Sequence, residues 1–422
     1  MSLTEIERKR SSLSARNREI LEKRLQGRPG ITGMSDSIVD TSNDLRLALA
    51  RCQRLEPLPV SWDSLKLACR HQAENLPPEL DLSETVNTAG QANRAALASA
   101  CIALDAMGVF RTPGESHTVE DIVAGRGILP TYRKLIARWM KELTRAQLLM
   151  RDSNRFVSIE PLLTQISDVV LNEVQGLRDK AAVDIPAILT GQRHTVELIF
   201  SMGSAQTVER AYEATAPSRY FNSIVAEAFR VLVASLPVGR PLRILEVGAG
   251  VGGTTSSVLP LLPPDRSLYG FTDLSKYFLE HAKSKYQSYP FVYYGLLDIN
   301  AAPEEAEHMP QMFDAILAAN VLHCARFLRD TLRHMASLLT SSGLLIMIEY
   351  TENRVAHIIL PGLLEGFSHF EDERLEVGEP LLSPGEWFKI LRASGFEKHA
   401  CFPEVDGPLD SMGEHVIVAS RG

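Results

Sequence analysis

The chain has 422 residues, which is enough for two or three domains with full hydrophobic cores. Its composition, with 45% hydrophobic and 23% charged residues, is that of an ordinary globular protein, and the formal charge of −8 argues against nucleic-acid binding. Five scattered cysteines without a C-x-x-C pair argue against a disulfide framework or a zinc cluster. No apolar run approaches the ~18 residues of a membrane span, and the N-terminus has no secretory signal, so we expect a cytoplasmic protein.

Residues 1–30 differ from the rest because they are rich in Lys and Arg. Ile6, Leu13 and Ile20 recur every seven residues, which indicates one side of a helix, and Gly27 and Pro29 would end it. We interpret this segment as a linker or a docking element.

Residues 31–235 are expected to be mostly helical. Helices are predicted around 97–110, 119–122 and 132–143, followed by a hairpin at 148–157 whose turn is Asp152-Ser-Asn. Three helices and a small hairpin are typical of a winged-helix-like module, yet the third helix carries only an ordinary basic face, which does not favour DNA binding. We interpret the region as a lid or substrate subdomain, ending in a long amphipathic helix at 224–233.

A glycine-rich turn organises the remainder of the chain. The apolar run Ile244 to Val247 predicts a buried strand, and Gly248, Gly250 and two further glycines break it before a helical start at 258–261. Glycines let a ligand approach the backbone closely. Glu246 stands two residues before Gly248, where a carboxylate repels phosphate but suits a cation. S-adenosylmethionine is such a ligand, and the pattern is similar to the first motif of class I methyltransferases. A glycine turn in another α/β protein is the alternative.

Strands and helices alternate from residue 243 onward. Strands are predicted at 267–272, 291–294, 313–318 and 344–348, helices at 276–288 and 326–340, and closing strands near the C-terminus. This alternation predicts a Rossmann-like parallel sheet with helices on both faces, which binds its ligand at the carboxyl ends of the strands. The predicted class is therefore α/β, with a helical, winged-helix-like lid before the core.

Acidic residues at the strand ends are candidate cofactor ligands. Asp273 ends the second strand, where a carboxylate can accept hydrogen bonds from two ribose hydroxyls; a helix N-cap is the alternative reading. Asp298 follows the third strand and could accept the adenine amino group, or be a turn residue. Glu246 is expected at the amino-acid end of the cofactor, where it would order the glycine loop or reach the methionine part through water.

His323 and Glu349 form the predicted catalytic pair. Asn320 and His323 follow the fourth strand and Glu349 ends the fifth, and neighbouring strand ends lie about 5 Å apart. A carboxylate beside a histidine orients the imidazole and stabilises its charged form, so that it can act as a base. The alternative is a helix-start histidine bonded to backbone. The chain has no G-x-S-x-G elbow, so hydrolase chemistry is not supported.

The segments 245–255, 269–275 and 313–323, with Trp387 and Gly395-Phe396, resemble the C-methyltransferase domains of polyketide synthases. The resemblance implies that His323 and Glu349 deprotonate the α-carbon of an acyl chain on an acyl carrier protein, beside other polyketide or nonribosomal synthase modules. It implies S-adenosyl-L-methionine as cofactor and, less securely, that Tyr220 and Asn222 line the approach. The expected cofactor residues are Glu246, Gly248, Gly250, Asp273, Asp298, Asn320, Tyr220 and Asn222. Beyond His323 and Cys324 there is no compact His/Asp cluster, so no metal is expected.

The stretch after the fifth strand is a candidate substrate loop. Phe367, His369 and Phe370 would wall an acyl tunnel, and core packing is the alternative. Three domains are expected: a docking segment or linker at 1–30, a lid at 31–235 and a methyltransferase core at 236–422. The predicted function is methylation of the α-carbon of a carrier-bound acyl thioester. An O- or N-methyltransferase for a small natural product, or an inactive scaffold domain, remain as alternatives.

Overall fold

The computed structural model describes residues 45, 48–49, 56–166, 180–193, 212–301 and 311–422. Contacts divide the chain into residues 1–40 and 41–422, and every described residue belongs to the second unit. The helix predicted within residues 1–30 therefore lies outside the described residues. Among the helices that the structure describes, none has the length and apolarity to cross a membrane.

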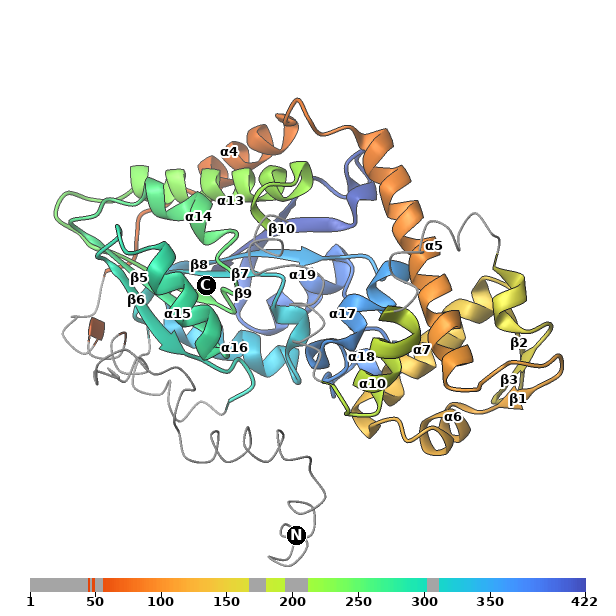
Figure 1. Cartoon of the computed structure of the whole chain (residues 1–422). Helices are drawn as coiled ribbons and strands as arrows, with labels where there is room; N and C mark the ends of the chain where they lie inside the picture. Colours follow the sequence, from red (N-terminus) through yellow and green to blue (C-terminus); the bar gives the residue numbers. More distant parts are fainter. Residues whose placement is uncertain (1–44, 46–47, 50–55, 167–179, 194–211, 302–310) are drawn as a thin grey trace, which may run out of the picture. The chain divides into compact units, whose positions relative to one another are not determined.

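A seven-stranded sheet forms the core, with the order β6-β5-β4-β7-β8-β10-β9 (Figure 1). Its strands are β4 (Leu242–Val247), β5 (Ser267–Asp273), β6 (Val292–Leu296), β7 (Phe313–Ala319), β8 (Leu339–Tyr350), β9 (Phe396–Phe402) and β10 (Glu414–Arg421). Strands β4 to β8 pair in parallel, which confirms the predicted strands and the Rossmann-like core. Their carboxyl ends therefore meet at one edge of the sheet.

The sheet is mixed, whereas the alternation of elements predicted a parallel one. Strand β10 lies between β8 and β9 and pairs antiparallel with both. The physical reason is the short connection: residues 403–413 link β9 to β10, while a parallel connection needs a crossover of a dozen or more residues. As a result β10 brings its first residue, Glu414, beside Tyr350 at the end of β8.

The helix after the glycine turn is shorter than the sequence pattern predicted. Helix α14 covers only Thr255–Val258, and the 3-10 turn η4 (Leu259–Leu261) follows. Pro260 lies inside η4, and proline lacks the N–H that a continuing helix requires. The α-helix after the glycine turn therefore ends at Val258.

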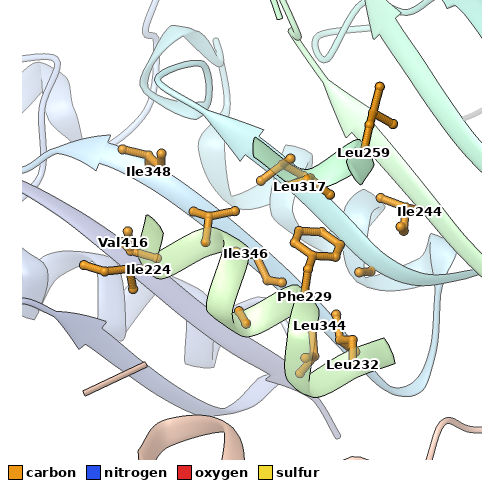
Figure 2. Close-up of a cluster of buried hydrophobic side chains, with 14 of the residues drawn as sticks. Ile224, Phe229, Leu232, Ile244, Leu259, Leu317, Leu344, Ile346, Ile348 and Val416 are labelled. Carbon is orange, nitrogen blue, oxygen red and sulfur yellow. The ribbon is translucent and has the colours of Figure 1, made fainter. Parts of the chain in front are cut away.

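One face of the sheet packs against helix α13 (Ala216–Ala234), which begins at the N-cap Thr215. Figure 2 shows Ile224, Phe229 and Leu232 of α13 in one cluster with Ile244, Leu317 and Ile346 of the sheet. Helix α4 (Trp62–Glu74) belongs to the same cluster and packs on α13, and α15 (Lys276–Lys285) contributes to it. Each fully buried Leu, Ile or Phe stabilises the fold by roughly 1.5–3 kcal/mol relative to exposure.

The opposite face is covered by α16 (Leu328–Leu338) and α19 (Pro384–Ala393). Alternate residues along one strand face opposite sides, so Leu245 and Val247 belong to this cluster while Ile244 belongs to the other. Trp387, which the sequence singled out, is 1% exposed within it. Both faces of the parallel strands are thus covered, as their apolar sequences require.

The helical region before the core forms a third cluster. It contains α5 (Leu82–Ala106), α6 (Val119–Gly125) and α7 (Arg133–Arg145), and a small sheet of order β1-β3-β2. Strands β2 (Leu149–Asp152) and β3 (Arg155–Ser158) are the predicted hairpin; β1 is Ser116–His117. Ile358, Ile359 and Leu363, which follow β8, belong to the same cluster. The segment that follows β8 therefore packs within the helical region.

Short elements complete the described chain. They are η1 (Pro130–Tyr132), η2 (Leu162–Gln165), η3 (Lys180–Asp184), α10 (Ile185–Leu189), η6 (Leu322–Cys324), η7 (Val355–Ile358), α17 (Leu360–Leu363), η8 (Glu365–Phe367), α18 (Arg374–Val377) and η9 (Asp410–Met412).

Candidate active site

The glycine turn after β4 has the left-handed backbone that glycine favours. Gly248 and Gly250 have φ values of +60° and +56°. A Cβ atom on Gly248 would lie 2.3 Å from Cγ2 of Val321, so this glycine permits a close approach of two turns. A Cβ atom on Gly250 would meet no heavy atom within 4 Å. The turn therefore presents bare backbone to open space at Gly250, which fits a ligand lying against it.

Asp273 connects the glycine turn to the next strand end. The backbone N–H of Gly250 donates to its Oδ2 at 2.9 Å, and that of Ser275 donates to its Oδ1 at 2.7 Å. Burial raises the pKa of the Asp273 carboxyl, although the backbone hydrogen bonds oppose this change. The carboxyl thus joins the backbone of Gly250 to that of Ser275, which is the N-cap of α15. Asp273 is therefore not itself the helix cap of the alternative reading, and its contact with ribose hydroxyls stays a prediction.

Glu246 lies beneath the turn at the end of β4 and is 1% exposed. Its Oε2 accepts hydrogen bonds from Thr255 Oγ1 at 2.6 Å and from the Tyr269 hydroxyl at 2.7 Å. Burial raises the pKa of Glu246 to about 7, against the effect of these two hydrogen bonds. The side chain therefore anchors the turn to α14 and β5, and its contact with a cofactor stays a prediction.

Asp298 is exposed in the turn after β6, where its Oδ1 accepts the N–H of Asn300 at 2.8 Å. The sequence reading missed two apolar neighbours at this edge. Leu274 is 70% exposed, and Leu296 is 37% exposed and pairs in register with Asp273. Exposed apolar side chains beside a carboxylate can hold a flat aromatic base. The signal was present: Leu274 follows Asp273 directly.

His323 and Glu349 are brought together as predicted. His323 Nδ1 lies 2.7 Å from Glu349 Oε2, and the two side chains are 4% and 0% exposed. The other oxygen, Oε1, accepts the N–H groups of Val321 at 3.2 Å and Leu322 at 2.7 Å. Since an ionised carboxylate only accepts, Nδ1 carries the hydrogen of this contact, and Nε2 is left for proton exchange. Both the carboxylate and the ring are therefore fixed before any substrate binds.

The electrostatic surroundings favour the charged form of His323. Burial lowers the pKa of this imidazole, but the Cys324 and Glu349 side chains more than offset burial and raise the pKa to about 10. His357 lies nearby on η7, where burial and Arg354 lower its pKa to about 3. The charged form of His323 is thus stabilised, so the neutral imidazole takes up a proton more readily than an ordinary histidine does.

Asn320 occupies the strained position between β7 and the His323 turn, with φ of +52°. Its Nδ2 donates to Glu414 Oε1 at 2.8 Å, while its buried Oδ1 has no hydrogen-bond partner among the described residues. Such an unsatisfied acceptor fits a ligand that donates hydrogen bonds, as the ammonium of S-adenosylmethionine does. Burial raises the pKa of Glu414 to about 7. Sequence reasoning missed Glu414 because it lies 94 residues from Asn320.

The two predicted residues on α13 have different surroundings. Asn222 is buried; its Nδ2 donates to Tyr212 O at 3.1 Å and its Oδ1 accepts from Thr254 Oγ1 at 2.9 Å. Asn222 therefore connects Tyr212, which precedes α13, to Thr254 next to the glycine turn. Tyr220 is fully buried, and its hydroxyl donates to Ala73 O of α4 at 2.8 Å. This placement gives Tyr220 a packing role and disfavours its predicted contact with the cofactor.

The three residues of the predicted substrate loop also separate. The Phe367 ring packs edge-on against the His323 ring with centroids 4.6 Å apart. His369 is exposed, and Phe370 is fully buried, with Lys134 Nζ 4.3 Å from its ring centroid. Of these three residues, only Phe367 is therefore seen in contact with the predicted catalytic pair. Within the described residues, no group of three or more His, Cys, Asp or Glu side chains is arranged to hold a metal ion.

Comparisons with known proteins agree with this geometry. Residues 245–345 match the family of methyltransferase domains. The polyketide synthase ThaQ of Burkholderia thailandensis is 32% identical over 342 residues, which are 75% of this chain and 16% of that protein. The polyketide synthase PksR of Bacillus subtilis is 30% identical over 316 residues, which are 69% of this chain and 12% of that protein. The chain thus spans less than a fifth of these curated relatives.

Solved structures cover nearly the whole fold. The CurJ carbon methyltransferase is 29% identical with a TM-score of 0.75, over 85% of this chain and 98% of that one. The DszA carbon methyltransferase is 26% identical with a TM-score of 0.72, over 88% of this chain and 98% of that one. Together with the sheet order and the glycine turn, these similarities show that the chain belongs to the class I S-adenosylmethionine-dependent methyltransferases, among the polyketide synthase C-methyltransferase domains.

Proposed function

We propose that this chain methylates the α-carbon of an acyl thioester carried by an acyl carrier protein, with His323 as the base. The observation that carries the proposal is the buried 2.7 Å contact between His323 and Glu349 at the edge where the glycine turn lies. The close approach of Gly248 to Val321 brings that turn against the one that holds His323. Proton removal and methyl transfer can therefore occur side by side.

The residues present fit S-adenosyl-L-methionine, which supplies an electrophilic methyl group on its sulfonium when bound. We propose that Gly248 and Gly250 lie against it, Asp273 binds its ribose hydroxyls, and Asp298 its adenine. Asn320 Oδ1 would accept from the ammonium, and Glu246 beneath the turn favours a cation. Asn222 positions the turn through Thr254. The open space at Gly250 and the unsatisfied Oδ1 of Asn320 support this arrangement.

The base acts through Nε2. Removing a proton from an α-carbon beside a thioester leaves an enolate, and the carbon then holds the electron pair that a new C–C bond requires. Glu349 stabilises the imidazolium that forms. The two backbone N–H groups that donate to Glu349 Oε1 hold the carboxylate in place while His323 takes up the proton. Oxygen and nitrogen nucleophiles need less help of this kind, so a pre-oriented base supports carbon methylation.

The partner and the domain division belong to the same proposal. The relatives are polyketide synthases, which supports an acyl carrier protein as the partner of this chain. A carrier-bound β-ketothioester would be acidic enough for a histidine to deprotonate. We propose that residues 31–235 act as the lid over a core at 236–422. Within that lid, α13 packs on the sheet while α5 to α7 form their own cluster with residues 358–363. Phe367 against His323 supports placing the acyl chain along this side.

The test is His323→Ala in the full chain, with carrier-bound β-ketoacyl and malonyl substrates and isotope-labelled cofactor, and products read by mass spectrometry. We expect α-carbon methylation to fall by about 10²-fold or more, with cofactor affinity by calorimetry unchanged. A variant that methylates as fast as the parent would contradict the role of His323. A product methylated on oxygen or nitrogen would favour the other methyltransferases, and a parent chain that binds no cofactor would indicate a scaffold.

A further inference from the structure

Arg374 lies buried against the turn that carries His323, with 3% of its surface exposed. Its Nη1 donates to His323 O at 2.8 Å and to Pro380 O at 3.4 Å, and its Nη2 donates to Ala325 O. Nε and Nη2 each donate to Asp372, both at 2.7 Å. These contacts use all five N–H groups of the guanidinium, which a lysine cannot reproduce.

Asp372 holds the other end of the same turn. Its Oδ2 also accepts the N–H of Leu328, the first residue of α16, at 2.9 Å. Burial opposes ionisation of Asp372, but the hydrogen bonds from Arg374 and Leu328 outweigh it and lower its pKa. The ionised pair thus binds carbonyls at 323 and 325 and an amide at 328. A six-residue turn is fixed at both ends.

We propose that Arg374 is a positioning residue for His323: paired with Asp372, it fixes the turn 323–328 so that Nδ1 keeps its contact with Glu349 and Nε2 faces the substrate. This inference rests on the proposed role of His323 as the base. A planar five-donor fork defines position more sharply than a single flexible cation does. Misplacement of a catalytic group by 1 Å costs on the order of 10²-fold in rate.

The same arginine connects the catalytic turn to the helical region. Arg374 Cζ lies 5.3 Å from the centroid of the Phe370 ring, and Lys134 Nζ lies 4.3 Å from it. Lys134, on α7, donates to Ser368 O at 3.0 Å and to Phe370 O. Both cationic side chains therefore lie close to the Phe370 ring, next to the turn that carries His323.

The test is Arg374→Gln in the full chain, with the pKa of His323 read by NMR of 13Cε1-labelled histidine. A His323→Gln sample assigns the signal. The titratable groups facing His323 are Glu349 from β8, Cys324 from its own turn and His357 from η7, and the variant retains all three. We expect the His323 pKa to fall toward its ordinary value as the Glu349 contact loosens. We expect kcat to fall about 10- to 100-fold with the cofactor KM changed less than about twofold.

Arg329→Gln is the matched control, since this arginine lies on α16 and makes an exposed pair with Glu373. It should leave both readouts unchanged. If Arg374→Gln does not fold, Asp372→Asn combined with Arg374→Met removes both charges together and leaves no buried charge unpaired. An unmoved His323 titration, a loss of rate that only follows the folded fraction, or two variants that cannot fold would each overturn the proposal.

The titration is independent of turnover. If His323→Ala methylated normally, the proposed function would fail, while the NMR measurement would still decide whether Arg374 positions the imidazole. Arg374→Lys completes the series: it keeps the charge but not the fork, so we expect it to restore stability more than it restores kcat or the His323 pKa. Equal restoration of all three would indicate that only charge matters.

Discussion

Replacing Glu349 by Gln tests the proposed catalytic pair, His323 and Glu349, most directly. The glutamine oxygen can still accept the N–H groups of Val321 and Leu322, so the turn keeps its backbone contacts. The other oxygen becomes an NH2 group that faces His323 Nδ1. Because two donors cannot pair, Nδ1 must become the acceptor and the hydrogen moves to Nε2. Nε2 then cannot take a proton from the substrate.

The expected loss follows from these contacts. The change removes one charge-assisted hydrogen bond, worth roughly 1.5–3 kcal/mol, and the tautomer that the base needs. Together we expect kcat to fall by about 10²- to 10⁴-fold. The pH profile should change as well. The parent rate should rise with pH toward the raised His323 pKa of about 10, because only the neutral imidazole is a base, whereas the variant should show its inflection at lower pH.

Stability gives a second readout with a defined sign. The folded-state pKa of His323 is raised from 6.5 to about 10, so its contribution to stability is complete below pH 6.5 and is lost as pH rises through 10. Glu349→Gln should remove that loss, which urea unfolding at several pH values measures. Glu352→Gln is the control, because that carboxylate is 57% exposed and pairs with Arg354. A variant within about threefold of the parent rate, with the same inflection, would refute the assigned roles.

Two further predictions concern the cofactor side. Gly250→Ala should weaken cofactor binding in calorimetry, because the new Cβ enters the open space beside the turn. Gly239→Ala is the control: it has the same left-handed backbone strain and also no neighbour within 4 Å, so it should leave cofactor affinity unchanged. Equal effects of the two substitutions on affinity would count against a ligand at Gly250. Burial raises the folded-state pKa of Glu246 from 4.5 to about 7, so ionisation destabilises the fold as pH rises through that range. Glu246→Gln should therefore flatten the dependence of unfolding free energy on pH between 4.5 and 7, and an unchanged slope would contradict the burial.

Local patterns predicted most of the core. The apolar strands, the glycine turn and Asp273 could be placed because each depends on residues close in sequence and on the common edge of parallel strands. The contact between His323 and Glu349 followed from the same rule, since their strands are neighbours in the sheet. The hairpin at β2 and β3 was recognisable from its own turn.

The features that the sequence did not reveal depend on distant contacts. Glu414 reaches Asn320 only because β10 inserts antiparallel beside β8, an order that no local pattern encodes. Arg374 donates to the carbonyls of His323 and Ala325, which lie about fifty residues earlier in the chain. In the sequence, nothing distinguishes Arg374 from the other charged residues around it. Tyr220 resembled an approach residue, but the packing of α4 on α13 buries it. Tertiary contacts decided these three cases.

The close approach of Gly248 to Val321 has a consequence for engineering. The two turns share one van der Waals boundary, so a larger side chain at position 321 would displace Gly248 and, with it, the turn against which we propose that the cofactor lies. Libraries aimed at new acyl chains should therefore leave position 321 alone, or vary it jointly with 248. Under the proposed site, substrate range and cofactor affinity would then change together and not independently.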